Sequence, residues 1–276
     1  MKIDNVIHFW SKKGLINQYS STFSGIKCFD FIDDACQLRY LKKIINKYFN
    51  NKFLNILDVG AGLGRFSIPL AETGHYVVAL EPAKSIYKNL LKKQQIKSLN
   101  NLKCLNILFE HYKMQSALRF DIIIFSGVLY FYDDISLNKI IDKSKHLLSN
   151  SGLIFIRDFF SKKNINTKST VCFGARCYYR PFSFWENIFS KKNMKVINRY
   201  SCNLRRPFFK KFFFLGTKIF GNNFENKIFP ICKLKLVEMF SHLYRTIQIE
   251  KCFYYYLLQA IWPSIIIIRK KKYEKL

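Results

Sequence analysis

The feature that most constrains this chain is a glycine-rich loop between an apolar strand and a helix. The short apolar run Asn55–Val59 leads directly into Gly60-Ala-Gly-Leu-Gly64. Glycines allow a sharp turn and let a ligand approach the main chain closely, because no Cβ intervenes. Seventeen residues after Gly64, at the end of the next apolar run, Glu81 is placed to accept hydrogen bonds from both hydroxyls of a ribose. This arrangement predicts a nucleoside-binding α/β fold.

Strand and helix patterns alternate along the rest of the chain. Strands are predicted at residues 55–59, 76–80, 102–109, 120–125, 153–156, 195–198 and 264–268, and helices at 34–49, 66–72, 84–95, 136–148 and 182–191. Continuous apolar strands that alternate with helices indicate a mostly parallel sheet covered on both faces. In such a sheet the ligand binds at the carboxyl ends of the strands, where the strand order reverses.

The loop itself discriminates between two kinds of nucleoside cofactor. A dinucleotide fingerprint, G-x-G-x-x-G, needs its third glycine where this chain has Arg65. Asp58 places a carboxylate two residues before the first glycine, where it would repel a pyrophosphate but not an ammonium or sulfonium group. The loop therefore favours a cationic amino-acid nucleoside.

A series of motifs, in order, resembles those of the class I S-adenosylmethionine-dependent methyltransferases. They are LDVGAGLGRFS (57–67), VVALEPA (77–83), FDIIIFSGVLYFYDD (120–134), LLSNSGLIFIRDFF (147–160) and YRPFSFWENIFSKKNMKVI (179–197). The resemblance implies an enzyme with S-adenosyl-L-methionine as its cofactor. It also implies a Rossmann-like, doubly wound, mostly parallel seven-stranded sheet with an antiparallel last strand and a helical insert before that strand.

The same resemblance assigns roles to individual residues. It implies that Glu81 binds the ribose, that Pro82 borders the adenine, and that Asp58 anchors the loop or the cofactor's amino group. The segment 109–111 occupies the place of an acidic residue near the adenine amino group. The full set of implied cofactor contacts is Asp58, Gly60, Ala61, Gly62, Glu81, Pro82 and Ser126.

Asp158, just beyond the predicted strand 153–156, is the candidate catalytic residue. It is either a general base on an acceptor hydroxyl or a solvated strand-end carboxylate. Methyl transfer does not require a base, since holding the nucleophile and the sulfonium in line supplies much of the rate. Tyr178–Arg180 are expected in a substrate-side loop, where anion or sugar binding and plain packing both remain open. The histidines and cysteines show no ligand spacing, so no metal site is expected.

The chain is predicted to comprise four parts. Residues 1–35 form a helical lead-in, 36–200 the cofactor-binding domain, 201–262 a basic aromatic insert, and 263–276 the last strand with a basic tail. Within the insert, residues 205–221 place aromatic side chains on one helical face and lysines on the other. That pattern is typical of an interfacial membrane helix, and equally of a helix packed on its parent domain.

The formal net charge of +28 bears on the partner. It suggests nucleic acid or an anionic membrane, but drift towards a lysine- and asparagine-rich composition accounts for it as well. The leading interpretation is a cytoplasmic methyltransferase, with peripheral attachment to the inner face of a membrane as an extension. Its acceptor is a small molecule, a glycan or a lipid-linked compound. The alternatives are an RNA-directed methyltransferase and a non-catalytic S-adenosylmethionine-binding protein. Against the former, the residues after Phe125 lack the N-P-P-Y and Pro-Cys runs of nucleic-acid methylation.

Overall fold

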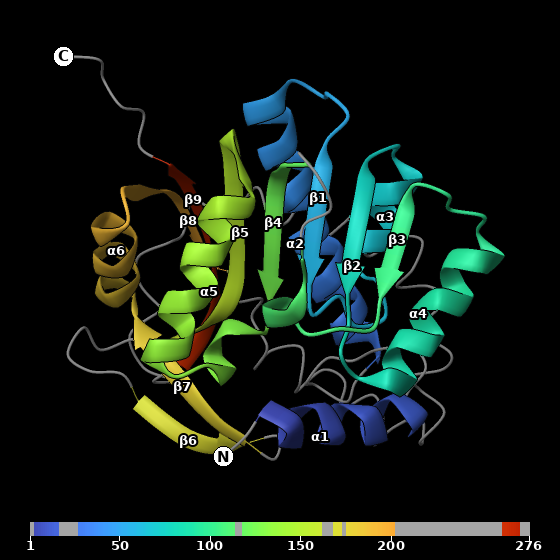
Figure 1. Ribbon diagram of the computed structural model, residues 1–276, viewed down its shortest axis with the longest axis horizontal. Helices are drawn as coiled ribbons and strands as arrows, with labels where there is room; N and C mark the ends of the chain where they lie inside the picture. Colours follow the sequence, from blue (N-terminus) through green and yellow to red (C-terminus); the bar gives the residue numbers. More distant parts are fainter. Residues whose placement is uncertain are drawn as a thin grey trace, which may run out of the picture. The chain divides into compact units, whose positions relative to one another are not determined.

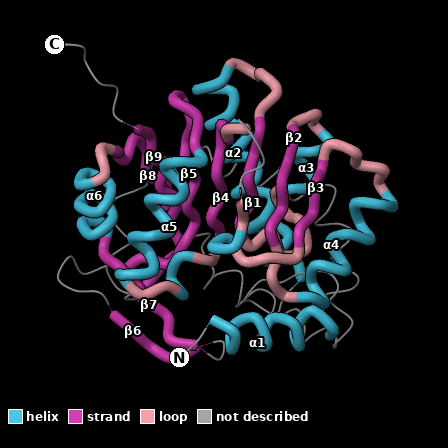
Figure 2. The backbone as a smooth tube through the Cα atoms, viewed as in Figure 1, coloured by secondary structure: helices cyan, strands magenta, loops and turns pink. Residues whose placement is uncertain are grey.

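The computed structural model describes residues 3–16, 27–113, 118–161, 168–172, 175–201 and 261–270 (Figures 1 and 2). The chain separates into two units. The first comprises residues 1–21, 49–201 and 260–276, and the second comprises 22–48 and 202–259. All the described strands belong to the first unit, whereas the described part of the second is most of helix α2 (Lys27–Phe49). Residues 202–260 of the predicted insert lie outside the described residues.

A nine-stranded sheet forms the centre of the first unit. Its parallel part has the order β3 (Leu102–Leu105), β2 (Tyr76–Leu80), β1 (Asn55–Val59), β4 (Phe120–Ser126), β5 (Leu148–Ser161). Beyond β5 the sheet continues into β9 (Ile261–Lys270), which runs antiparallel to β5 and to its other neighbour, β8 (Met194–Ser201). The predicted doubly wound sheet with an antiparallel last strand is confirmed.

The two remaining strands, β6 (Lys168–Cys172) and β7 (Ala175–Pro181), form an antiparallel hairpin. β7 also pairs in parallel with the end of β5, through Phe160 opposite Arg180. The expectation of a loop at Tyr178–Arg180 is therefore wrong. The signal was in the sequence, because Ala175, Cys177 and Tyr179 alternate with more exposed residues in the period of a strand with one buried face.

Helices cover both faces of the sheet, as the alternating pattern predicted. On one face, side chains of α5 (Asp134–Leu147) and α6 (Phe182–Lys191), such as Leu137 and Trp185, pack into one core with Ile123 and Ile154 of the central strands. On the other face, Phe66 before α3 (Ser67–Glu72) packs edge-on against Phe155 of β5, with ring centroids 5.9 Å apart. No helix of the described ranges is long and apolar enough to cross a bilayer.

Helix α1 (Ile3–Ile16) belongs to the first unit and packs against α4 (Lys84–Ile96). Ile7 and Trp10 contact a small cluster of Leu63, Ala83 and Ile86. The hydroxyl of Ser85 donates to the carbonyl of Ser11 at 2.5 Å. Because α1 also contacts β7, it runs across the carboxyl ends of the strands (Figure 1). The helix therefore lies at the edge of the sheet that carries the glycine-rich loop.

Candidate active site

The glycine-rich loop leaves β1 in the middle of the sheet, beside the point where the strand order reverses. Gly60 has a φ of +68°, and a Cβ added there would lie 2.6 Å from Cγ2 of Val128. Only glycine fits this position, because both the left-handed backbone and the close approach exclude a side chain. The N–H groups of Gly60 and Ala61 both donate to the carbonyl of Leu80, at 2.9 Å each. The loop is thus tied to the end of β2.

Glu81, the residue after β2, closes this arrangement. Its two carboxylate oxygens accept from the N–H of Gly62 at 2.8 Å and from the N–H of Ala83 at 2.8 Å. The residue is only 6% exposed. Burial raises the pKa of Glu81 to about 7, against the lowering effect of these two N–H groups; the charge of Asp58 raises it further. A carboxylate offers about four acceptor positions, so two remain for a ligand.

Asp58, the fourth residue of β1, is turned towards the helix that follows the loop. Its Oδ2 accepts from the hydroxyl of Ser67 at 2.5 Å, and the residue is 1% exposed. Burial raises the pKa of Asp58 to about 6, while the Ser67 hydrogen bond and the charge of Arg65 lower it. The contact with Ser67 ties β1 to the first turn of α3. Contact of Asp58 with an amino group of the cofactor stays a prediction.

Ser126 ends β4 next to the same loop. Its hydroxyl accepts a short hydrogen bond from the guanidinium of Arg65, whose carbon lies 4.8 Å from the centre of the Phe66 ring. Arg65 occupies the position where a dinucleotide-binding loop has glycine. Its side chain therefore joins the start of α3 to the end of β4, a connection that the sequence did not reveal.

The strand β3 ends four residues earlier than predicted, at Leu105. Asn106 follows, and its amide donates to the carbonyls of Glu81 at 2.8 Å and Pro82 at 3.0 Å. This contact turns the chain away from the sheet, so that Phe109–His111 form a 3₁₀ turn (η1) rather than a strand end. Asn106, not the segment 109–111, directly follows β3 beside the Glu81 group.

Asp158 lies near the end of β5 and is 1% exposed, so it is not a solvated strand-end carboxylate. Its Oδ2 accepts from the N–H of Tyr130 at 3.0 Å and its Oδ1 from the N–H of Phe159 at 3.1 Å. Burial raises the pKa of Asp158 to about 7, against the lowering effect of these two N–H groups and the charges of Arg157 and Arg180.

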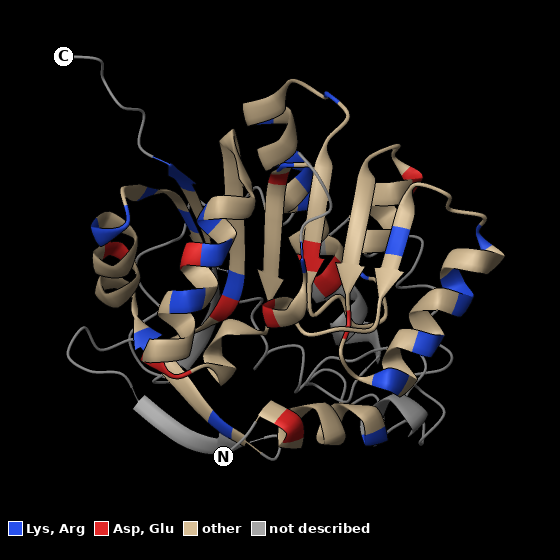
Figure 3. Ribbon diagram, in the orientation of Figure 1, with Lys and Arg blue, Asp and Glu red and all other residues tan. Residues whose placement is uncertain are grey.

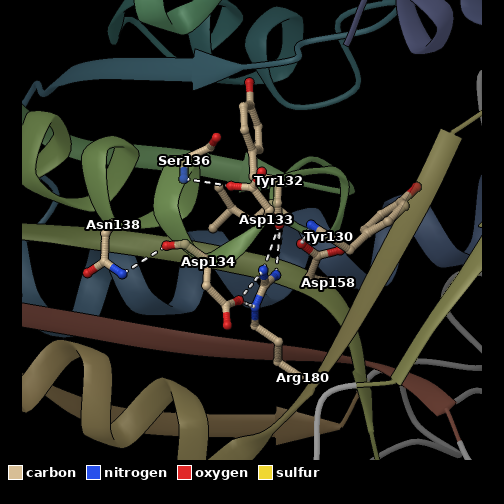
Figure 4. Close-up of polar contacts among 9 residues, drawn as sticks. Tyr130, Tyr132, Asp133, Asp134, Ser136, Asn138, Asp158 and Arg180 are labelled. Carbon is tan, nitrogen blue, oxygen red and sulfur yellow. Dashed lines mark hydrogen bonds and ion pairs between the residues drawn. The ribbon is translucent and has the colours of Figure 1, made fainter. Parts of the chain in front are cut away.

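The turn that Asp158 contacts, Leu129–Phe131 (η2), is also held by Arg180 of β7 (Figure 4). The fully buried guanidinium of Arg180 donates to the carbonyl of Tyr132 at 2.6 Å and, more weakly, to that of Leu129 at 3.5 Å. It also pairs with Oδ1 of Asp134, at 2.9 Å from Nε and 2.7 Å from Nη2. Packing and ion pairing thus explain the buried position of Arg180, for which the sequence left anion binding and packing open.

The predicted cofactor residues gather at one edge of the sheet. Hydrogen bonds join Gly60, Ala61, Gly62, Glu81 and Pro82 into one group, and Arg65 ties Ser126 to it. Figure 3 shows acidic residues at these carboxyl ends and basic residues along helices α4 and α5. Among the described residues, no cluster of histidine, cysteine or acidic side chains is suited to hold a metal ion.

These residues fit a cationic amino-acid nucleoside. The loop has no room for a Cβ at Gly60, because Cγ2 of Val128 packs against the main chain there. Glu81 keeps acceptor capacity for two ribose hydroxyls. The carboxylate of Asp58, at the end of β1 beside the loop, suits a positively charged ligand and disfavours a dianionic one.

Comparison with known protein families identifies the class. The model of a family described as "Methyltransferase domain" matches residues 34–197. A search of curated protein sequences finds no match. Because the family model covers more than half of the chain, the protein belongs to the methyltransferase-domain family, and the predicted membership of the class I S-adenosylmethionine-dependent enzymes is confirmed.

Solved structures with the same fold include three methyltransferases. The 1,6-didemethyltoxoflavin-N1-methyltransferase of Burkholderia thailandensis, with bound 1,6-didemethyltoxoflavin and S-adenosylhomocysteine, is 12% identical. It aligns over 99% of this chain and 92% of its own, with a TM-score of 0.57. The magnesium protoporphyrin IX methyltransferase of Synechocystis PCC 6803, with bound S-adenosylmethionine, is 14% identical over 74% and 93% of the two chains, with a TM-score of 0.55. An O-methyltransferase of a Brevibacillus brevis polyketide synthase, with bound S-adenosylhomocysteine, is 13% identical over 85% and 72%, with a TM-score of 0.56.

Proposed function

We propose that this methyltransferase transfers the methyl group of S-adenosylmethionine to a small-molecule acceptor at the carboxyl edge of the sheet. The observation that carries the proposal is the closed group of Gly62, Glu81 and Ala83, in which a buried carboxylate bridges the glycine-rich loop and the start of α4. When bound, S-adenosylmethionine supplies an electrophilic methyl group on its sulfonium.

The residues of the chain bind and orient in this proposal. Glu81 accepts the two ribose hydroxyls with the lone pairs that Gly62 and Ala83 leave unused. The main chain at Gly60 packs against Val128 and is tied to the end of β2, which fixes the shape of the loop around the ligand. Ser126 faces the amino-acid part and Pro82 the adenine. Rate enhancement comes mainly from holding acceptor and methyl group in line, which restricts both partners before reaction. A proton-accepting role for Asp158 stays a prediction.

A small molecule is the proposed acceptor class, and a glycan or lipid-linked acceptor is a variant of it. The solved structures of the same fold support this choice, since two of them are named for small-molecule acceptors, 1,6-didemethyltoxoflavin and magnesium protoporphyrin IX. Transfer of a radioactive methyl group from S-adenosylmethionine into fractionated extracts of the source cells tests the proposal. Label in small organic metabolites or lipids supports it. Label confined to RNA would replace it by the RNA-directed alternative.

Binding of the cofactor is tested separately with purified protein. Isothermal titration with S-adenosylhomocysteine should show one site per chain. An absence of binding to both S-adenosylhomocysteine and S-adenosylmethionine would refute the proposed function. Binding without label transfer to any fraction would favour the non-catalytic alternative.

We further propose a cytoplasmic location with peripheral attachment to an anionic membrane surface through the segment 205–221. The support is its sequence pattern of aromatic and lysine residues. The protein should sediment with vesicles of phosphatidylglycerol at low salt, and the Lys210→Gln/Lys211→Gln variant should sediment less. Retention of the wild-type protein in the supernatant would exclude the attachment.

A further inference from the structure

The turn η2 follows β4 and lies between the glycine-rich loop and the hairpin β6–β7. Just before it, Val128 approaches Gly60 so closely that the glycine could carry no Cβ. Within it, the ring of Tyr130 stacks on Tyr179 of β7 at 6.2 Å and 23°, and meets Phe159 of β5 edge-on at 5.6 Å. Any displacement of this turn therefore moves the surface against which the glycine-rich loop packs.

Opposite charges hold the backbone of the turn from two strands. Asp158 of β5 accepts its N–H at Tyr130, and Arg180 of β7 donates to its carbonyls at Leu129 and Tyr132. Figure 4 shows both side chains directed at the turn from different elements. Hydrogen bonds to charged groups are stronger than those between neutral groups, both side chains are removed from water, and Asp158 carries its full charge at pH values above its raised pKa of about 7. The turn is thus held through its main chain as well as through the packed ring of Tyr130.

Neighbouring contacts fix the orientation of the guanidinium. It lies 5.3 Å from the centre of the Tyr178 ring and 5.1 Å from that of Phe184. Its ion pair with Asp134 joins it to the first residue of α5, whose N-terminus Asp133 caps by accepting from the N–H of Ser136 at 2.8 Å. Rotation of Arg180 away from the turn would break the ion pair as well as the hydrogen bonds to the carbonyls.

We infer that Asp158 and Arg180 are positioning residues that clamp the turn Leu129–Tyr132 and thereby set the place of Val128 against the glycine-rich loop. The inference rests on the proposed function, because its consequence is the shape of the cofactor site. In this inference Asp158 acts through the turn, by its hydrogen bond to the N–H of Tyr130, rather than on the acceptor. Arg180 acts on the same turn and does not bind an acceptor anion.

Hydrogen exchange of the backbone amides, followed by mass spectrometry, tests the clamp in the full-length protein. Asp158→Asn keeps the shape of the side chain, but its amide group opposes one of the two N–H donors. Arg180→Met removes the bonds to the carbonyls. We expect both to exchange the amides of residues 128–132 roughly tenfold to a hundredfold faster, and to bind S-adenosylhomocysteine roughly tenfold more weakly. Arg180→Lys should recover part of both effects, since a lysine pairs with Asp134 but cannot span both carbonyls.

Two matched controls separate the clamp from general loss of a charge. Asp142→Asn removes the exposed ion pair with Lys192, and Arg199→Met removes a guanidinium 4.1 Å from the Phe182 ring. Both should leave exchange in 128–132 and the affinity unchanged. Midpoints of thermal unfolding show whether a variant has failed to fold. If Arg180→Met does not fold, the exchange and affinity of Arg180→Lys and Asp158→Asn test the clamp.

The outcomes are distinct. Unchanged exchange in 128–132 for Asp158→Asn and Arg180→Lys overturns the clamp, and so does faster exchange with wild-type affinity. Loss of methyl transfer by Asp158→Asn with normal exchange and normal affinity also overturns it, because that is the behaviour of a general base. A wild-type protein that does not bind S-adenosylhomocysteine refutes the proposed function instead.

Discussion

The buried carboxyl group of Glu81 makes cofactor affinity depend on pH. Its pKa is raised to about 7, mainly by burial, so the side chain is partly protonated near neutrality. The ionised form accepts both ribose hydroxyls, whereas a protonated carboxyl group loses part of that capacity. Affinity should therefore be full above pH 7 and fall as the pH drops through 7.

The magnitude follows from the titration. About nine-tenths of the sites are ionised at pH 8 and about one-tenth at pH 6, so the affinity should fall about tenfold if only the ionised form binds. Glu81→Gln removes this titration, and its amide opposes either the N–H of Gly62 or that of Ala83. The loss of charge-assisted hydrogen bonds, about 1.5–3 kcal/mol, corresponds to a loss in affinity of about tenfold to a hundredfold at pH 8.

Isothermal titration with S-adenosylhomocysteine between pH 5.5 and 8.5 measures both effects. Asp58 and Asp158, whose pKa values are raised to about 6 and about 7, also titrate in this range, so the part due to Glu81 is the difference between wild type and Glu81→Gln. Glu72→Gln is the matched control, since Glu72 forms an exposed ion pair with Lys97. Wild-type affinity in Glu81→Gln at pH 8, or an equal pH dependence in both proteins, would refute the ribose-binding role.

Three further predictions concern the loop and its surroundings. Gly60→Ala should abolish binding of S-adenosylhomocysteine in titrations. Adding Val128→Ala to that variant should restore part of the binding, because it removes the clash at 2.6 Å. The control Gly74→Ala, at a glycine with a φ of +91° away from the loop, should lower only the unfolding midpoint. Asp58→Asn should raise the unfolding midpoint more at pH 8 than at pH 5. The pKa of Asp58 is raised to about 6 in the folded protein, so the buried charge destabilises the folded state fully only above pH 6. An equal gain at both pH values would contradict this. Trp10→Ala should weaken binding several-fold by loosening α1, and unchanged affinity would show that α1 does not support the site.

The sequence predicted those parts of the fold in which local pattern and tertiary environment agree. β1 and β2 begin and end where their apolar runs do, and α6 matches its predicted range. β1 and β2 each have a parallel strand on both sides, so their continuous apolar composition predicts a buried strand. The glycine-rich loop and Glu81 were predictable for the same reason, since a strand, a turn and a helix fix their mutual spacing.

The rest depended on contacts between distant residues. Asn106 ends β3 by binding carbonyls 24 and 25 positions away, and no local pattern marks that role. Arg180 was conspicuous in the sequence, but its partners are 46 to 51 residues distant, so binding and packing could not be separated. Asp158 was expected at a strand end, whereas β5 extends to Ser161 because β7 and β9 supply partners for its last residues.

The pairing of β8 with β9 has a consequence for how this chain tolerates change. Ser201 and Asp158 both face Ser264, in the strand that separates them, so residues 202–260 leave and rejoin the sheet roughly 10 Å from Asp158. Closing a segment of 59 residues rather than a four-residue hairpin costs only about 2 kcal/mol, because loop entropy grows with the logarithm of length. The stability of the sheet therefore depends only weakly on the length of the segment between β8 and β9. A segment of another length or sequence can replace residues 202–260 while Gly60, Glu81 and their hydrogen bonds stay in place.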